Sequence, residues 1–558
     1  MPAPLVQPKR RGRTSLRVAV TLSTLCGTGA LVTMTAAATG ATSAPPTAQP
    51  THVSPVVTTM PVPAARTTPQ MSGGVTLVSS LPPTATAASF DLVAVTWVHA
   101  SAPADMTVEV KVRRGGDWSS WQHLEFDPSE APGSGEDSLV RDGTAPLWVG
   151  GADGIQARAL SPSGLRPEGL RVVAIDPGSS PSDRAATSGT TTAASSGAAS
   201  AAAGGLAPMP SIVSRRQWGA DPSLGDACWP PRYGSTVKAV FVHHTVGSNS
   251  YSRADGPAVV RGIHAYHTQA MHWCDIGYNF LVDRYGTIYQ GRRGGIQKPV
   301  RGSHAGEYNV TSIGVSLMGD FSSQPTTKAM RAGLVKLVAW RLAAYYRSAH
   351  SSGIVNGQRF ARISGHRDAM ATACPGQTVY DWLPALRNRV ERRMGDARTP
   401  IHDKWRSLLQ DGARLGAVFI GERPHADGRV TTFGRGRIYW SKSTGAHALT
   451  GAILERFRRL GGTASRLGFP DSDVRAAGRP GSERARFEGG SIYWSPRTGA
   501  RPVVGAILAR FLRTGGAGGR LGLPTSSEYV VRDGRRQNFR HGTITWLAAS
   551  GRTYVTYT

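Results

Sequence analysis

The sequence predicts a multidomain fold in which an α/β domain is preceded by an all-β module and followed by an array of repeats. Three observations predict it. The 558 residues exceed what a single hydrophobic core organises. Stretches without large apolar residues divide the chain. Blocks of similar sequence recur at regular spacing toward the C-terminus.

The composition fits globular domains joined by polar linkers, with 40% hydrophobic and 18% charged residues. The formal net charge of +28 indicates polyanionic partners. Nucleic acid, anionic cell-wall polymers and a membrane surface all satisfy this charge, so the charge alone does not choose between them.

Residues 1–41 are expected to be a secretory signal peptide. Basic residues from Lys9 to Arg17 precede an apolar run over 18–38, and Ala36 to Ala38 offer a small-residue cleavage site. An uncleaved signal anchor is the alternative. No later stretch approaches the roughly 20 apolar residues of a membrane span. We therefore expect a secreted, cell-wall-associated protein without a membrane span after cleavage, and export argues against nucleic acid as a partner.

Two low-complexity segments flank the predicted all-β module. Residues 42–74 are rich in Pro, Thr and Ala and are expected to form a flexible leader. Residues 75–176 contain short alternating runs such as "FDLVAVTWVHA" and "MTVEVKVRR", which are typical of strands. This module shows no catalytic constellation, so we expect a binding or spacer role. Residues 177–210 are Ser, Ala and Gly in the main and predict a linker.

Residues 211–395 mix strand-like and helix-like patterns. "VKAVFVHHT", "YNFLVD" and "SIGVSLMG" read as strands, whereas "TKAMRAGLVKLVAWRLAAYYRSA" has helical periodicity. This segment is therefore predicted to be the α/β domain.

Residues 401–558 repeat themselves. "GRIYWSKSTGAHALTGAILERF" recurs as "GSIYWSPRTGARPVVGAILARF", and Trp440, Trp494 and Trp546 mark the period. The blocks "RLGFP" and "RLGLP" resemble the LGFP repeat of secreted cell-wall proteins, which implies wall association. The Tyr-Trp pairs are either ligand contacts or only the core of each repeat. The Arg-rich composition suggests attraction to anionic cell-wall polymers, with a merely solvated surface as the alternative.

Two short segments hold candidate metal ligands. In "VKAVFVHHT", strand alternation places His243 and His244 on opposite faces, so only one of them can face a given site. In "SGHRDAMATACPG", His366 and Cys374 stand eight residues apart, and a loop that curls back could bring both to one metal. Two imidazoles and a thiolate form a ligand set for catalytic zinc. A buried structural Cys with an unrelated His is the alternative.

Four ordered blocks point to a known family. "FVHHT", "HWCDIGYNFLVDRYGTIYQGR", "GSHAGEYNVTSIGVSLMGDF" and "GHRDAMATACPG" together resemble the peptidoglycan recognition protein and type-2 N-acetylmuramoyl-L-alanine amidase family, over roughly residues 211–393. The resemblance implies a mixed central sheet with flanking helices and a Zn²⁺ at the floor of a peptidoglycan-binding groove. It assigns the zinc ligands to His243, His366 and Cys374.

The resemblance also implies roles for other residues. Tyr278 matches the active-site tyrosine. Thr372 occupies a position where some members have Lys, which argues against a Lys-assisted mechanism here. His304 and Arg292 match substrate-binding positions that line the groove.

The same resemblance implies a disulfide between Cys228 and Cys274, which leaves Cys374 for metal. Asp275 is interpreted as structural rather than as a fourth ligand. Three further histidines are expected to be solvated or at the groove rim: His264, His267 and His272.

The sequence therefore predicts a secreted, zinc-dependent amidase that hydrolyses the bond between N-acetylmuramic acid and L-alanine and is targeted by its repeats. The alternative is a non-catalytic peptidoglycan-binding or wall-anchoring protein. Members of the family that only bind peptidoglycan lack the Cys, whereas every ligand position is filled here, which favours the enzyme.

Overall fold

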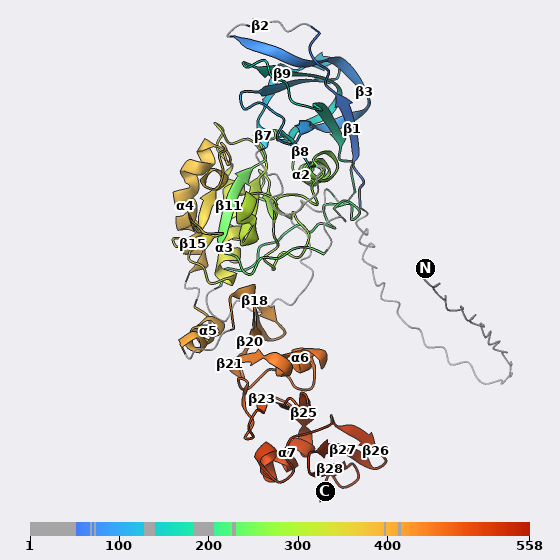
Figure 1. Ribbon diagram of the computed structural model, residues 1–558, viewed down its shortest axis with the longest axis vertical. Helices are drawn as coiled ribbons and strands as arrows, with labels where there is room; N and C mark the ends of the chain where they lie inside the picture. The colour runs from blue at the N-terminus through green and yellow to red at the C-terminus, as the bar shows by residue number, and fades with distance from the viewer. Residues whose placement is uncertain are drawn as a thin grey trace, which may run out of the picture. The chain divides into compact units, whose positions relative to one another are not determined.

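A computed structural model describes residues 52–66, 70–71, 74–127, 140–181, 183, 206–225, 230–395, 398–410 and 415–558 (Figure 1). The predicted signal peptide of residues 1–41 and the cysteine Cys228 lie outside these residues. The expected pairing of Cys228 with Cys274 therefore stays a prediction. None of the helices in the described part of the chain combines the length and apolar character needed to cross a bilayer.

The N-terminal domain is all-β, as predicted. In the described residues its strands form one antiparallel, ten-stranded sheet around two long strands that pair through several register shifts. Alternate residues of these strands face a buried aliphatic core. The strands are β1 (Val56–Pro61), β2 (Gln70–Met71), β3 (Val75–Val98), β4 (Thr107–Arg114), β5 (Asp117–Trp118), β6 (Gln122–Leu124), β7 (Phe126–Asp127), β8 (Arg141–Thr144), β9 (Leu147–Ser161) and β10 (Arg171–Asp176).

This domain begins earlier than expected. Strand β1 lies inside the segment 42–74 that the composition had indicated as a leader, and it pairs with β10 from Val56 opposite Asp176 to Pro61 opposite Arg171. The strand lies at the end of the strand order, and Pro61, which cannot donate to a ladder, occupies its last position. Backbone pairing with β10 thus orders a segment whose Pro and Thr content suggested a linker.

The central domain is α/β. Its five-stranded mixed sheet has the order β13-β12-β14-β11-β17, in which only β12 and β13 are antiparallel. The strands are β11 (Ala239–His244), β12 (Phe280–Val282), β13 (Ile288–Gln290), β14 (Ser312–Leu317) and β17 (Ile363–Gly365), with a separate hairpin of β15 (Ser352–Val355) and β16 (Gln358–Ala361). The helices are α2 (Gly256–Ala265), η2 (Tyr266–Ala270), η3 (Gly306–Val310), α3 (Lys328–Ala344), η4 (His366–Asp368) and α4 (Gln377–Met394).

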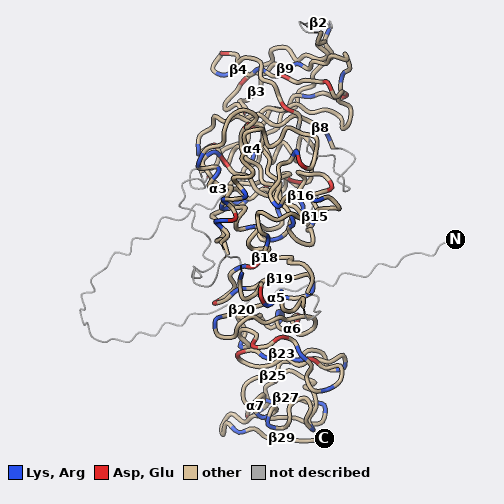
Figure 2. Tube along the Cα trace, turned by 90° about the vertical axis from the view of Figure 1, so that its left-hand side faces the viewer, with Lys and Arg blue, Asp and Glu red and all other residues tan. Residues whose placement is uncertain are grey.

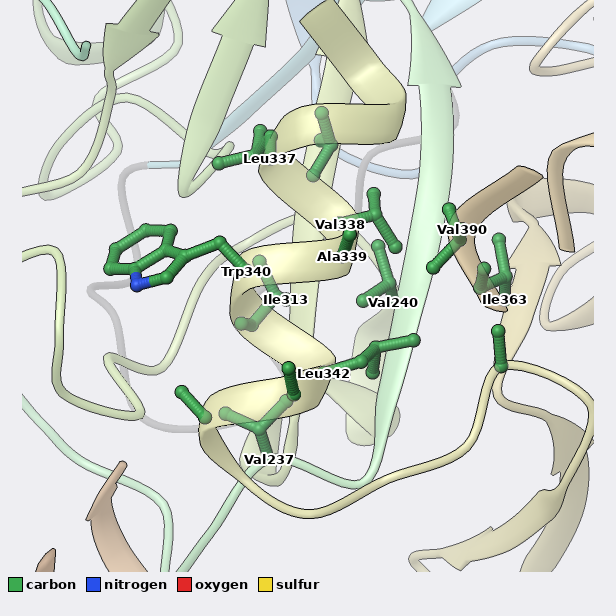
Figure 3. Close-up of a cluster of buried hydrophobic side chains, with 14 of the residues drawn as sticks. Val237, Val240, Ile313, Leu337, Val338, Ala339, Trp340, Leu342, Ile363 and Val390 are labelled. Carbon is green, nitrogen blue, oxygen red and sulfur yellow. The ribbon is translucent and has the colours of Figure 1, made fainter. Parts of the chain in front are cut away.

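One face of this sheet is covered by α3. The helix begins where the Thr327 side chain accepts a hydrogen bond from the Met330 N–H, a standard N-cap. Its apolar residues pack on Val240 and Ile313 of the strands, as Figure 3 shows around Val338 and Leu342. Because α3 buries this face, the chemistry must lie on the other face or at its edges.

The C-terminal region is a repeat array, as predicted. Helix α5 (Pro400–Gln410) precedes three four-stranded sheets, and helices α6 (Gly451–Arg459) and α7 (Gly505–Arg513), each followed by a short 3₁₀ turn, η5 (Gly462–Ala464) and η6 (Gly516–Gly518), come after the first and second sheets. The sheets are β18 (Val418–His425), β19 (Gly428–Phe433), β20 (Gly436–Ser441) and β21 (Gly445–Thr450); β22 (Arg475–Ala476), β23 (Glu483–Phe487), β24 (Gly490–Trp494) and β25 (Arg501–Val504); and β26 (Tyr529–Val531), β27 (Gly534–Phe539), β28 (Gly542–Leu547) and β29 (Thr553–Tyr557).

Aromatic rings join consecutive repeats. Phe511 of α7 meets Tyr493 of its own repeat edge-on at 5.3 Å between ring centroids and stacks on Phe539 of the next repeat at 4.7 Å. Phe457 of α6 makes the equivalent contacts with Tyr439 and Phe487. The tyrosines of the Tyr-Trp pairs are therefore buried core residues, and each helix fills the space between two sheets.

We predict that Phe511→Ala lowers the free energy of unfolding by about 3–5 kcal/mol, because Phe511 is fully buried between two repeats. Urea unfolding followed by tryptophan fluorescence measures this. Leu512→Ala is the matched control, since Leu512 is half exposed on the same helix and should change stability by less than about 0.5 kcal/mol. Equal effects of the two substitutions would refute the coupling of repeats through Phe511.

Candidate metal centre

Three potential metal ligands converge in the α/β domain. The ligand atoms of His243, His366 and Cys374 all lie within 4.8 Å of one another, and all three side chains are buried. His243 lies at the carboxyl end of β11, and His366 follows the parallel neighbouring strand β17. Because carboxyl ends of parallel strands meet at one edge, the two histidines are brought together by the sheet. The loop after η4 returns to the same edge and adds Cys374.

Strand alternation separates the two adjacent histidines. His243 shares a sheet face with Phe241, whereas His244 points to the other side, where its Nδ1 accepts a hydrogen bond from the Phe321 N–H at 3.3 Å. The backbone N–H of His244 donates to Cys374 Sγ at 3.4 Å. His244 thus supports the sulfur through its main chain, while His243 faces the centre.

Local contacts hold the loop that presents Cys374. Thr372 Oγ1 accepts a hydrogen bond from the Cys374 N–H at 3.1 Å, and the Arg367 N–H donates to the Cys374 carbonyl at 2.9 Å. The Cys374–Pro375 peptide bond is cis. Gly376 has φ +83°, and a Cβ there would overlap the backbone of Phe321, so only glycine fits this turn.

The two ring nitrogens of His243 face different partners. Nδ1 lies 3.8 Å from Cys374 Sγ, and Nε2 lies 3.1 Å from Nδ1 of His304. Burial, followed by the neighbouring His366 and His304, lowers the pKa of His243 well below its usual value. A neutral imidazole with a lone pair is the form that binds metal.

His304 and Arg292, the two residues expected to bind substrate, are both buried. His304 is fully buried, and burial lowers its pKa to about 3. Arg292 is 9% exposed and donates from Nη1 to Ser303 Oγ at 2.6 Å. Contacts of both residues with substrate stay predictions.

Tyr278 is brought to the centre. Its ring lies 5.3 Å from that of His243 and 5.9 Å from that of His267, between centroids. His267 in turn stacks on Trp273 at 4.5 Å and accepts a hydrogen bond from the Gly277 N–H at Nδ1. His267 is 1% exposed, so the expectation that it is solvated is wrong. The neighbouring Trp273 was the signal in the sequence, because an aromatic ring offers a buried histidine a stacking partner.

Asp275 is structural, as interpreted from the sequence. Its Oδ1 lies 3.0 Å from Arg215 Nη1 and 3.0 Å from His264 Nε2, and its Oδ2 accepts from the Arg293 N–H at 2.8 Å. Burial opposes ionisation of this carboxyl, but the Arg215 guanidinium and the His264 hydrogen bond hold its pKa below the usual value. His264 is buried here as a partner of Asp275, not solvated as expected.

We predict that Asp275→Asn lowers the free energy of unfolding at pH 7 by about 3 kcal/mol, because it leaves Arg215 buried beside a neutral group. A carboxyl with a depressed folded pKa stabilises the fold above its unfolded pKa of about 3.9 and loses this effect as the pH falls further. Native stability should therefore decline below about pH 4, and less steeply in the variant. Asp381→Asn, at an exposed position of α4, is the control. Equal urea midpoints for both variants would contradict this role.

The donor set fits zinc. Two imidazoles and one thiolate within reach of a single ion leave a fourth position for water or substrate, as in catalytic rather than structural zinc sites. Backbone N–H groups and His304 are among the contacts of these donors, and no carboxylate belongs to the cluster in the described residues.

Comparison with protein families gives three matches. The N-acetylmuramoyl-L-alanine amidase family matches residues 233–377, and the LGFP repeat matches 415–465, 467–519 and 521–557. A family described as N-terminal galactose-binding domain-like matches residues 36–195. This last match includes β1, in agreement with the early start of the all-β domain.

Similar proteins cover the α/β domain. The peptidoglycan-recognition protein SC1a/b of Drosophila simulans is 33% identical over 170 residues, which is 30% of this chain and 82% of that protein. Peptidoglycan recognition protein 1 of Mus musculus is 34% identical over 171 residues, covering 30% of this chain and 84% of that protein. Among solved structures, wild-type Drosophila PGRP-LB is 27% identical, with a TM-score of 0.26, over 31% of this chain and 93% of its own.

Proposed function

The chain belongs to the peptidoglycan recognition protein and type-2 amidase family, and from this premise we propose that it is a zinc-dependent N-acetylmuramoyl-L-alanine amidase. Its reaction would be hydrolysis of the amide between N-acetylmuramic acid and L-alanine in peptidoglycan. The convergence of His243, His366 and Cys374 within 4.8 Å supports this most directly. A protein that only recognises peptidoglycan has no need of a buried thiol between two imidazoles.

A zinc ion held by these three residues would supply Lewis-acid activation of water and of the amide carbonyl. The chain's own residues then have separate tasks. His243, His366 and Cys374 hold the ion, and Thr372 supports the turn that presents the sulfur. Burial of the centre excludes bulk water and strengthens each electrostatic contact within it.

Tyr278 is the proposed hydrogen-bond donor to the reacting carbonyl. Its ring packs against His243, next to the ligand cluster, and is only 6% exposed. A phenol held in this way donates to the negative charge that develops on the carbonyl oxygen, without reorganisation of solvent. Thr372 is proposed to assist at the same oxygen through its hydroxyl proton, since its lone pair already accepts from the Cys374 N–H.

The flanking parts are proposed to serve delivery. A signal peptide over residues 1–41 would export the chain, and the LGFP repeats would bind it to the cell wall, with attraction to anionic wall polymers through their Lys and Arg residues (Figure 2). The second candidate function, non-catalytic binding or anchoring, is supported by relatives whose names record recognition alone.

We predict that the protein releases peptide-free glycan and free L-alanine amino termini from purified peptidoglycan. Zinc chelation should abolish this release and added zinc should restore it, because the donor set lacks activity without the ion. Mass spectrometry of the digest identifies the new ends. Retention of the protein on the wall with stoichiometric zinc and no new termini would favour binding or anchoring. Cys374→Ser should lose zinc and activity together, and stoichiometric zinc in that variant would contradict the ligand assignment.

We predict that Tyr278→Phe lowers kcat by about 10²-fold with zinc content unchanged, the usual size for the loss of one donor to a developing oxyanion. Tyr251→Phe is the matched control, because Tyr251 is also a buried tyrosine of this domain, but its hydroxyl donates to the Met318 carbonyl. Turnover of soluble muropeptides measures both. Native turnover in Tyr278→Phe would remove the phenol from the mechanism.

A further inference from the structure

We propose that His304 is a positioning residue of the metal centre, which accepts a hydrogen bond from Nε2 of His243 and so directs Nδ1 of His243 toward the ion. This inference rests on the proposed zinc site but not on the reaction performed there. It differs from the substrate-binding role that the family resemblance implies for His304.

The two nitrogens of the His243 ring contact different partners. Its Nδ1 faces Cys374 Sγ, at 3.8 Å, and its Nε2 faces His304 Nδ1, at 3.1 Å. Nδ1 is therefore the nitrogen that contacts the ligand sulfur. The two rings are nearly perpendicular, at 78°, and their centroids are 5.0 Å apart, which is a hydrogen-bonding rather than a stacking arrangement.

The contact between the two rings also determines which nitrogen of each ring holds its proton. A neutral imidazole has one N–H and one lone pair, and the nitrogen that binds a metal must offer the lone pair. With Nδ1 of His243 bound, its proton is on Nε2, and this N–H donates to His304. His304 must then accept at Nδ1 and hold its own proton on Nε2. The contact between the two rings thus selects one tautomer for each.

His304 is held in place by its backbone hydrogen bonds and by two glycines. Asn309 Oδ1 accepts hydrogen bonds from the His304 N–H at 3.0 Å and from the Ala305 N–H at 3.1 Å, which fixes the backbone. A Cβ on Gly302 or on Gly314 would overlap the His304 ring. The two glycines, twelve residues apart in sequence, therefore leave a slot that the ring fills. An acceptor held this firmly can orient its donor.

Burial separates this role from substrate binding. His304 is 0% exposed, so the described structure leaves no surface of the ring for a glycan or peptide to contact. Hydrogen-bond partners of this kind orient metal-binding histidines, and their loss typically weakens metal affinity by about 10–100-fold.

The test compares zinc dissociation constants, measured by competition with a chromophoric chelator, for the full-length chain and three variants. His304→Leu removes the acceptor and should weaken zinc binding by about 10–100-fold. His304→Asn places an amide oxygen close to the position of Nδ1 and should retain most of the native affinity. His264→Asn is the matched control, a buried histidine of the same domain that contacts Asp275 instead of a ligand, and should bind zinc as the native chain does.

A second readout needs no variant. Long-range ¹H–¹⁵N correlation spectra of the zinc-loaded native protein, labelled at histidine, report which nitrogen of each ring holds the proton. We expect the proton of His243 on Nε2. A proton on Nδ1, or native zinc affinity in His304→Leu, would overturn this inference and leave the amidase proposal standing. A native chain that binds no zinc would overturn both, whereas zinc binding without cleavage would overturn only the amidase.

Discussion

The α/β domain is organised around the burial, at one edge of its sheet, of three side chains that could hold a metal ion. A thiol and two imidazoles are enclosed together there, and burial, followed by the neighbouring His366 and His304, lowers the pKa of His243. A divalent cation would offset the cost of burying these groups, since it favours the thiolate and the neutral imidazoles that bind it. Without a cation, the same burial would only disfavour the charged forms. The arrangement is therefore intelligible as a site built for an ion.

The two faces of the sheet have different roles, one in core packing and the other at the candidate metal centre. Val240 of β11 faces the core beneath α3 (Figure 3), and so does Val242. Phe241 belongs to a cluster on the other side, and strand alternation places His243 on that same side. One strand thus contributes alternately to packing and to the metal centre. A shift of register by one residue would exchange His243 for His244 and lose the site. The pairing of β11 with parallel neighbours on both sides, β14 and β17, fixes that register.

The sequence pattern predicted the features that local periodicity determines, but not those that depend on how the chain folds back on itself. Alternation alone predicted that His243 and His244 cannot share a site, and the recurring blocks predicted the repeat array. The burial of His304 could not be predicted, because it depends on Gly302 and Gly314 closing around the ring. His264 and His267 were expected to be solvated or at the groove rim, whereas Asp275 and Trp273 enclose them in the folded chain. Strand β1 was missed because its order comes from β10, more than a hundred residues away.

In the repeat array, different residues provide the packing between repeats and the positive charge. Phe457 and Phe511 join the repeats through buried ring contacts, so these contacts do not depend on the exposed residues. Several acidic groups are already engaged there: Glu422 is buried against Arg429, and Glu528 is nearly buried against Arg535. Lys and Arg outnumber Asp and Glu in this region, so its net charge is positive (Figure 2). Such charge attracts an anionic polymer at long range but gives little specificity, and its effect weakens with salt. Tethering to the wall would raise the local concentration of substrate for the centre without any new contact at the zinc ligands.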